Sequence, residues 1–102
     1  VIDGDTLIIG DQRIRLANVD TPELGTEKGE QAAKAVTELL SKSKIRLEIF
    51  GKGQYGRDLA YVWIDENTML QTWLIRNNYS GYMKHFGAGK YHEELQKAAS
   101  GQ

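Results

Sequence analysis

The chain lacks cysteine altogether, and only one of its 102 residues is proline. The absence of cysteine excludes disulfide bonds, thiolate metal sites and a cysteine nucleophile. No apolar run approaches the roughly 20 residues that a membrane-spanning helix needs. An excess of basic charge is missing too, because 13 Lys and Arg face 14 Asp and Glu, for a net charge of −1. A broad basic surface for nucleic acid is therefore not expected, and any phosphate binding must be local.

The composition predicts one folded domain with a single core. The chain is near the commonest domain size, and it is 40% hydrophobic and 26% charged, which is typical of neither disordered nor membrane proteins. It begins with Val1-Ile2, which resembles the end of a strand and has no initiator Met. We therefore expect one domain over residues 1–102 whose first strand and C-terminal end are truncated.

Strands are predicted where apolar residues form a short continuous run or alternate with polar ones. Besides Val1-Ile2, the predicted strands are residues 6–9, 13–16, 45–49 and 59–64. In the second of these, the alternation places Arg13 and Arg15 on one face and Ile14 and Leu16 on the other. Tyr61, Trp63 and Trp73 recur at strand or helix spacing, which favours core packing for all three.

Helices are predicted in three places. From Thr26 to Leu40 apolar residues recur at helical spacing, and Thr26 is the expected N-cap. A second apolar stripe, Met69 to Leu74, is expected to follow a cap at Thr68. A third helix, over residues 91–99, is polar enough to be predicted as exposed. The order of elements predicts an α+β domain, a five-stranded Greek-key β-barrel of the oligonucleotide-binding type with three α-helices.

Five charged residues from separate segments have the chemistry of phosphoryl transfer. Asp5 and Asp20 flank a strand and would converge on an oxygen-rich site, which suits Ca²⁺ better than zinc. Glu23 would then act as a base on a nearby water. Arg15 and Arg57 carry rigid, always charged forks that match phosphate oxygens.

Each of these residues also has an ordinary structural interpretation. Asp3, in Asp3-Gly4, is best explained as a turn residue. Asp20 before Thr-Pro would cap or turn the chain, and Arg15 would be solvated on a polar strand face. Arg57 would be a hairpin residue. Neither histidine, His85 nor His92, has metal-ligand spacing, and we assign them no catalytic role.

The order and spacing of several motifs decide between these interpretations. The motifs are Asp3-Gly4-Asp5-Thr6, Arg15 five residues before Asp20-Thr21-Pro22-Glu23, and Tyr55-Gly56-Arg57 followed by Leu59-Ala60-Tyr61-Val62. Together they resemble the staphylococcal nuclease (thermonuclease) family from Val1 to about Tyr79, and more loosely beyond. The resemblance implies the same barrel with three helices.

The resemblance also implies a role for each matching residue. Asp5, Asp20 and the backbone carbonyl of Thr21 would bind Ca²⁺, Glu23 would be the general base, and two guanidiniums would stabilise the transition state. Those guanidiniums belong to Arg15 and Arg57. The implied reaction is hydrolysis of single-stranded or locally unpaired DNA or RNA that leaves 3′-phosphate ends, by a monomer without membrane contact. A secreted or cell-envelope location is favoured by the resemblance alone.

The residues expected to bind the nucleotide depart from the family pattern. Tyr55 matches a family tyrosine near the bound phosphate, whereas the acidic residue and lysine expected just before Tyr-Gly-Arg are replaced by Gly53 and Gln54, with Lys52 close by. The family's pair of tyrosines beyond the second helix is replaced by Lys84 and Phe86. Base stacking would fall to Phe86 or Tyr82. The alternative to a nuclease is a non-catalytic module that binds nucleic acid or protein.

Overall fold

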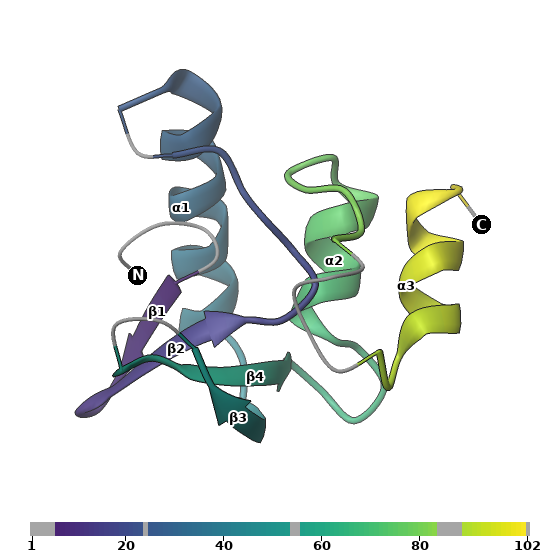
Figure 1. Cartoon of the computed structure of the whole chain (residues 1–102). Coiled ribbons are helices and arrows are strands. Elements are labelled where there is room, and N and C mark those ends of the chain that lie inside the picture. Colours follow the sequence, from purple (N-terminus) through teal and green to yellow (C-terminus); the bar gives the residue numbers. More distant parts are fainter. Residues whose placement is uncertain (1–5, 24, 54–55, 84–88, 102) are drawn as a thin grey trace.

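The computed structural model describes residues 6–23, 25–53, 56–83 and 89–101. These residues form an α+β domain with one four-stranded sheet and three helices (Figure 1). In chain order the elements are β1 (Thr6–Ile9), β2 (Gln12–Leu16), α1 (Glu27–Ser41), β3 (Arg46–Lys52), β4 (Asp58–Trp63), α2 (Leu70–Arg76) and α3 (His92–Ala99). The predicted α+β class, the three helices and four of the five strands are therefore confirmed, whereas the five-stranded Greek-key barrel stays a prediction. The fifth strand, at Val1-Ile2, lies outside the described residues and stays a prediction.

The sheet has the strand order β1-β2-β4-β3, so its two inner strands are far apart in sequence. β1 and β2 form an antiparallel hairpin, β3 and β4 form a second one, and β2 joins β4 in parallel. Figure 1 shows α1 on one side of the molecule, and α2 beside α3 on the other. No helix among the described segments is long and apolar enough to cross a membrane.

The core follows the sequence pattern. In β2 the side chains of Ile14 and Leu16 are fully buried, whereas Arg13 is exposed. Tyr61 and Trp63 are buried in the central strand β4, as predicted, and Trp73 is half-buried against the same core.

Thr26 and Thr68 illustrate two different outcomes for one residue type. The Thr26 Oγ1 accepts a hydrogen bond from the Gly29 amide at 3.0 Å, so its predicted role as the N-cap of α1 is confirmed. Thr68 was predicted to cap α2, and this is wrong: the N-cap is Met69, without a side-chain cap bond. The Thr68 carbonyl instead accepts from the Ile64 amide at 2.9 Å, and Met69 forms a β-bridge with Trp63. Residues 68–69 thus extend the pairing of β4, which delays the helix.

Helix α3 is less exposed than its composition suggests. Leu95 is fully buried and Ala98 is 4% exposed, and the helix packs on α2. The remaining residues of α3 are exposed or half-buried. The prediction of a polar, exposed helix is correct for its outer face only, because two well-spaced apolar residues suffice to anchor a helix of two turns.

A carboxylate on β3 connects the sheet to the start of α3. Glu48 accepts hydrogen bonds from Lys90 Nζ at 2.5 Å, from the Tyr91 hydroxyl at 2.5 Å and from Trp63 Nε1 at 3.2 Å. The bond from Lys90, followed by the bond from Tyr91, holds the pKa of the Glu48 carboxyl below its ordinary value. Ionised Glu48 therefore favours the docked position of residues 90–91.

We predict that this carboxylate makes part of the stability depend on pH. Because the folded pKa of Glu48 is lowered, its contribution is present above the ordinary carboxyl pKa of 4.5 and is lost as the pH falls through the folded value. The free energy of unfolding of the wild type should therefore exceed that of Glu48→Gln at about pH 7, and the gap should narrow towards about pH 3. Urea denaturation at both pH values measures it.

Tyr91→Phe provides the matched comparison for this prediction. It removes one of the three donors to Glu48 and keeps the ring that packs edge-on against Tyr61 and Trp63. The difference in free energy of unfolding between wild type and Tyr91→Phe should therefore change less with pH than the difference between wild type and Glu48→Gln. A gap between wild type and Glu48→Gln that stays constant with pH would contradict the assignment.

Candidate active site

The predicted catalytic run, residues 20–23, lines an open hollow of about 440 Å³. The hollow is lined by Asp20, Thr21, Pro22, Glu23, Lys28, Asn78, Tyr79, Ser80 and Gly81. Asp20 and Glu23 are exposed, whereas Thr21 is only 6% exposed. The run therefore presents two carboxylates to solvent at the rim of a concave surface. Its far wall comes from the segment after α2.

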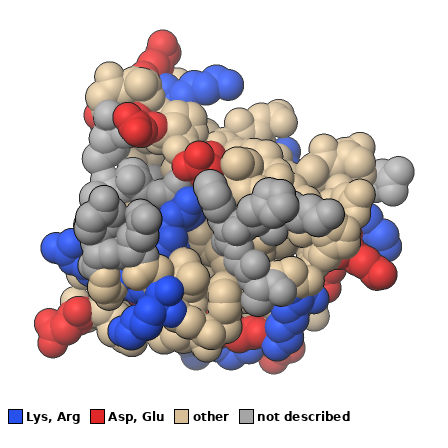
Figure 2. All heavy atoms as spheres, in the orientation of Figure 1, with Lys and Arg blue, Asp and Glu red and all other residues tan. Residues whose placement is uncertain are grey.

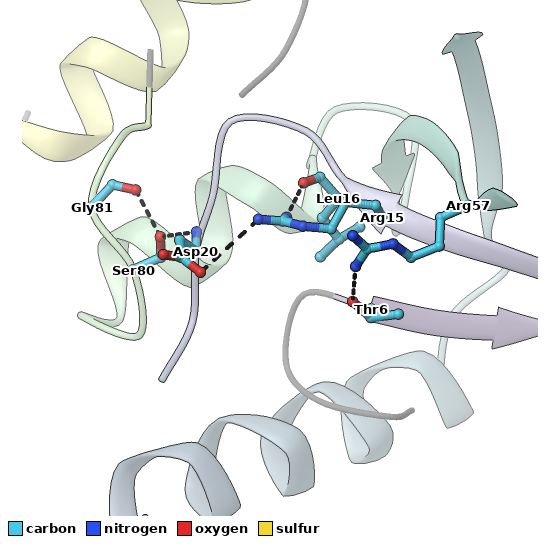
Figure 3. A network of polar contacts seen from close by, with 7 residues as sticks. All are labelled: Thr6, Arg15, Leu16, Asp20, Arg57, Ser80 and Gly81. Carbon is cyan, nitrogen blue, oxygen red and sulfur yellow. Dashed lines mark hydrogen bonds and ion pairs between the residues drawn. The ribbon is translucent and has the colours of Figure 1, made fainter. Parts of the chain in front are cut away.

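Arg15 points from β2 towards this run (Figure 3). Its Nη2 atom lies 4.0 Å from Asp20 Oδ1, and its Nη1 atom donates to the Leu16 carbonyl. The Arg15 side chain is 14% exposed and that of Asp20 is 55% exposed. Arg15 is thus more buried than Arg13, which is exposed.

Arg57, just before β4, lies on the same face of the sheet as Arg15. Its Nη1 atom donates to Thr6 Oγ1 at 3.2 Å, and Thr6 is the cross-strand partner of Arg15. Cross-strand partners project their side chains to one face. Figure 3 shows the Arg57 guanidinium beside Thr6 and the Arg15 side chain directed towards Asp20. Two half-buried cations on one face form a local site suited to an anion such as phosphate.

Three predicted site residues lie outside the described part of the chain: Asp5, Tyr55 and Phe86. Their placement, including the convergence of Asp5 with Asp20, stays a prediction. Tyr82 is described and half-buried; its hydroxyl lies 2.6 Å from His92 Nδ1, and the two rings are tilted at 56°. The structure therefore gives Tyr82 a partner within the fold. Its predicted role in base stacking stays a prediction.

The oxygen donors near the hollow suit a hard cation such as Ca²⁺. The Asp20 carboxylate and the Thr21 carbonyl are of the ligand type that Ca²⁺ prefers. Within residues 6–23, 25–53, 56–83 and 89–101, no three acidic or histidine side chains form a group that could hold a metal ion. The described donors thus fit the chemistry and form two of the three predicted ligands, and Asp5 would supply the third.

The lysine nearest to the Tyr-Gly-Arg turn is already engaged. Lys52 Nζ lies 2.6 Å from Asp58 Oδ1, and the Asp58 side chain is only 12% exposed. Gln12 also donates to Asp58, at 3.4 Å. Because Lys52 pairs with this carboxylate, it contributes little net positive charge to the site. Among the described residues on the face drawn in Figure 2, basic and acidic side chains are interspersed, which agrees with a local rather than a broad basic surface.

The start of α1 fixes the backbone at Glu23. The Glu23 carbonyl accepts from Thr26 Oγ1 at 2.7 Å and from the Thr26 amide at 3.4 Å. Gly29, in the first turn of α1, lies so close that a Cβ atom there would be 1.8 Å from the Glu23 oxygen. Gly29 had no predicted role. The available signal was a glycine three residues after the N-cap, where it lowers helix propensity with no local benefit.

We predict that Gly29→Ala destabilises the protein, although alanine is the better helix former by about 1 kcal/mol. The added methyl group must displace the backbone of Pro22 and Glu23, whose atoms would lie 1.8 to 2.9 Å from it. Overpacking of this kind costs about 1–3 kcal/mol. The free energy of unfolding, from urea denaturation, should fall accordingly.

Gly51→Ala is the control, because Gly51 does not have a positive φ and a Cβ atom there would meet nothing within 4 Å. It should leave the free energy of unfolding nearly unchanged. Equal stability of Gly29→Ala and wild type would show that residues 22–23 move away freely, and that Gly29 does not fix them.

Several known proteins are similar to this chain in sequence. The family model described as "Staphylococcal nuclease homologue" (SNase) matches residues 13–101. The chain belongs to this family. It is 41% identical over 78 residues to a thermonuclease of Staphylococcus intermedius, covering 65% of this chain and 46% of that protein. It is 33% identical over 110 residues to a thermonuclease of Staphylococcus hyicus, covering 96% and 64% respectively.

A relative outside the staphylococci bears a similar name. Endonuclease YncB of Bacillus subtilis (strain 168) is 39% identical over 89 residues, covering 72% of this chain and 41% of that protein. The chain thus spans about two fifths to two thirds of the length of these relatives. The resemblance seen in the sequence motifs is confirmed at the level of the family.

Proposed function

We propose that this SNase-family domain is a Ca²⁺-dependent nuclease that hydrolyses phosphodiester bonds of DNA or RNA. The observation that carries the proposal is the placement of Arg15 and Arg57 on one face, with Arg15 directed at Asp20 in the run that ends in Glu23. Family membership and the names of the relatives, thermonuclease and endonuclease, support it.

Each residue would have a distinct role in the reaction. Arg15 and Arg57 bind the scissile phosphate and stabilise the charge that develops on it. Glu23 takes a proton from the attacking water. The water oxygen bonds to phosphorus, the bond to the 5′ oxygen breaks, and that oxygen takes up a proton to leave a 5′-hydroxyl and a 3′-phosphate.

The Asp20 carboxylate and the Thr21 carbonyl, together with Asp5, would hold the cation. Bound Ca²⁺ would polarise the phosphate and orient the water. We further propose that Val1-Ile2 completes a five-stranded barrel, and that Tyr55, Tyr82 and Phe86 contact a single-stranded or locally unpaired substrate. The domain would act as a monomer.

Cleavage of single-stranded DNA tests the activity and the metal together. With Ca²⁺ the oligonucleotide should be cut to products with 3′-phosphate ends, and EGTA should abolish cutting because the cation site is emptied. Gel electrophoresis of an end-labelled substrate provides the measurement. Full activity in EGTA would refute the metal assignment. Binding without cleavage in Ca²⁺ would favour the non-catalytic module.

Replacement of Glu23 by Gln tests the general base. The amide cannot take the proton, so turnover should fall by about 10² to 10⁴, while binding of the oligonucleotide should change little. Glu27→Gln is the matched control, since Glu27 is an exposed carboxylate in the first turn of α1 that does not line the hollow. Near-normal turnover of Glu23→Gln, or an equal loss in Glu27→Gln, would remove Glu23 from this role.

A further inference from the structure

A buried asparagine separates β2 from the catalytic run. Asn18 has no exposed surface, and its φ of 64° lies in the left-handed region. Non-glycine residues seldom adopt that conformation, and asparagine is one of the few that do so readily. The chain therefore makes a sharp turn just two residues before Asp20.

Asn18 makes three hydrogen bonds to parts of the chain that are distant in sequence. Its Oδ1 atom accepts from the Tyr61 hydroxyl at 2.8 Å, and its Nδ2 atom donates to the Met83 carbonyl at 3.0 Å. Its own carbonyl accepts from the Met83 amide at 2.8 Å. The first bond anchors Asn18 to the buried core of β4. The other two bind the backbone of Met83 through both its carbonyl and its amide.

A second contact joins the same two segments on the side of the hollow. The Asp20 amide donates to Ser80 Oγ at 2.9 Å, and Ser80 Oγ donates in turn to the Gly81 carbonyl at 2.7 Å (Figure 3). Asp20, Ser80 and Gly81 all line the hollow. Residues 18–20 are thus fastened to residues 80–83 at two points, and Tyr82 lies between these points in sequence.

This arrangement depends on the hydrogen bonds of the Asn18 side chain and not only on its volume. A leucine of similar size would leave the Tyr61 hydroxyl and the Met83 carbonyl without their hydrogen bonds to this side chain. It would also disfavour the left-handed backbone. An aspartate would accept from Tyr61 but could not donate to Met83. The asparagine amide satisfies both partners.

We propose that Asn18 is a positioning residue that sets the catalytic run against the opposite wall of the hollow. It does not touch the substrate; it fixes the distance between Asp20 and the segment that carries Tyr82. This inference rests on the proposed nuclease function, because the effect on turnover requires it. A misplacement of about 1 Å in an active site can cost about 10² in rate.

Asn18→Gly tests the role, because glycine keeps the left-handed backbone and removes only the side chain. Turnover should fall about 10- to 100-fold, whereas KM should change less than threefold. Leu95→Ala is the control: it destabilises α3 by removing a fully buried side chain that lines no part of the hollow. Both variants are assayed at a temperature where circular dichroism shows them folded. Unchanged turnover in folded Asn18→Gly, or an equal loss in Leu95→Ala, would overturn the proposal.

Amide hydrogen exchange provides a readout that does not depend on cleavage. In Asn18→Gly, exchange should accelerate at Met83 and also at Asp20, whose amide bonds to Ser80 rather than to Asn18. Ser80→Ala is a second variant, milder for folding, which should accelerate exchange at Asp20 and lower turnover by less than Asn18→Gly does. Exchange at Asp20 that is unchanged in Asn18→Gly would overturn the positioning role. Absence of cleavage by the wild type would instead overturn the proposed function. The exchange rates would still show whether Asn18 controls the contact between Asp20 and Ser80.

Discussion

The parallel pairing of β2 with β4 is the constraint on which the site depends. The two strands are separated in sequence by α1 and β3, and their register sets Arg15 opposite Leu59. Arg57 precedes Leu59 by two residues and so shares its face by strand alternation. The pairing continues one residue beyond β2, where the Ala17 amide donates to the Ala60 carbonyl at 3.0 Å. The two arginines therefore lie on the same face only if β2 and β4 pair across this long connection.

The carboxylates are placed by contacts of another kind. After Ala17 the chain leaves the sheet, and its course depends on side chains: Asn18 bonds to β4 and to residue 83, and Thr26 bonds back to the Glu23 carbonyl. The position of the two arginines thus depends on the hydrogen bonds of the sheet. The position of Asp20 and Glu23 depends instead on the buried Asn18 amide and on the N-cap of α1. Functional side chains on a loop that a regular scaffold positions are common in active sites, so this arrangement agrees with the proposed function.

Local patterns predicted the elements well and their junctions less well. The alternation in β2 correctly buried Ile14 and Leu16, and Thr26 capped α1 as expected. The same prediction was wrong at Thr68, because the backbone at Met69 forms a β-bridge with Trp63 and the helix begins one residue later. Asn18 and Gly29 attracted no prediction, since their roles depend on partners 65 residues away or on a close backbone approach. Such contacts leave no periodicity in the sequence. The roles of the site residues that the motifs grouped together all stay predictions.

The shared carbonyl at Glu23 has a thermal consequence. The first turn of a helix frays more readily than its middle, and local opening requires less free energy than global unfolding. Here that turn includes Thr26 and Gly29, which also hold the Glu23 backbone. Heating that opens this turn would free the backbone of Glu23 before the domain unfolds as a whole. An activity that needs Glu23 would then be lost reversibly below the melting temperature of the domain, because the first turn of α1 opens first.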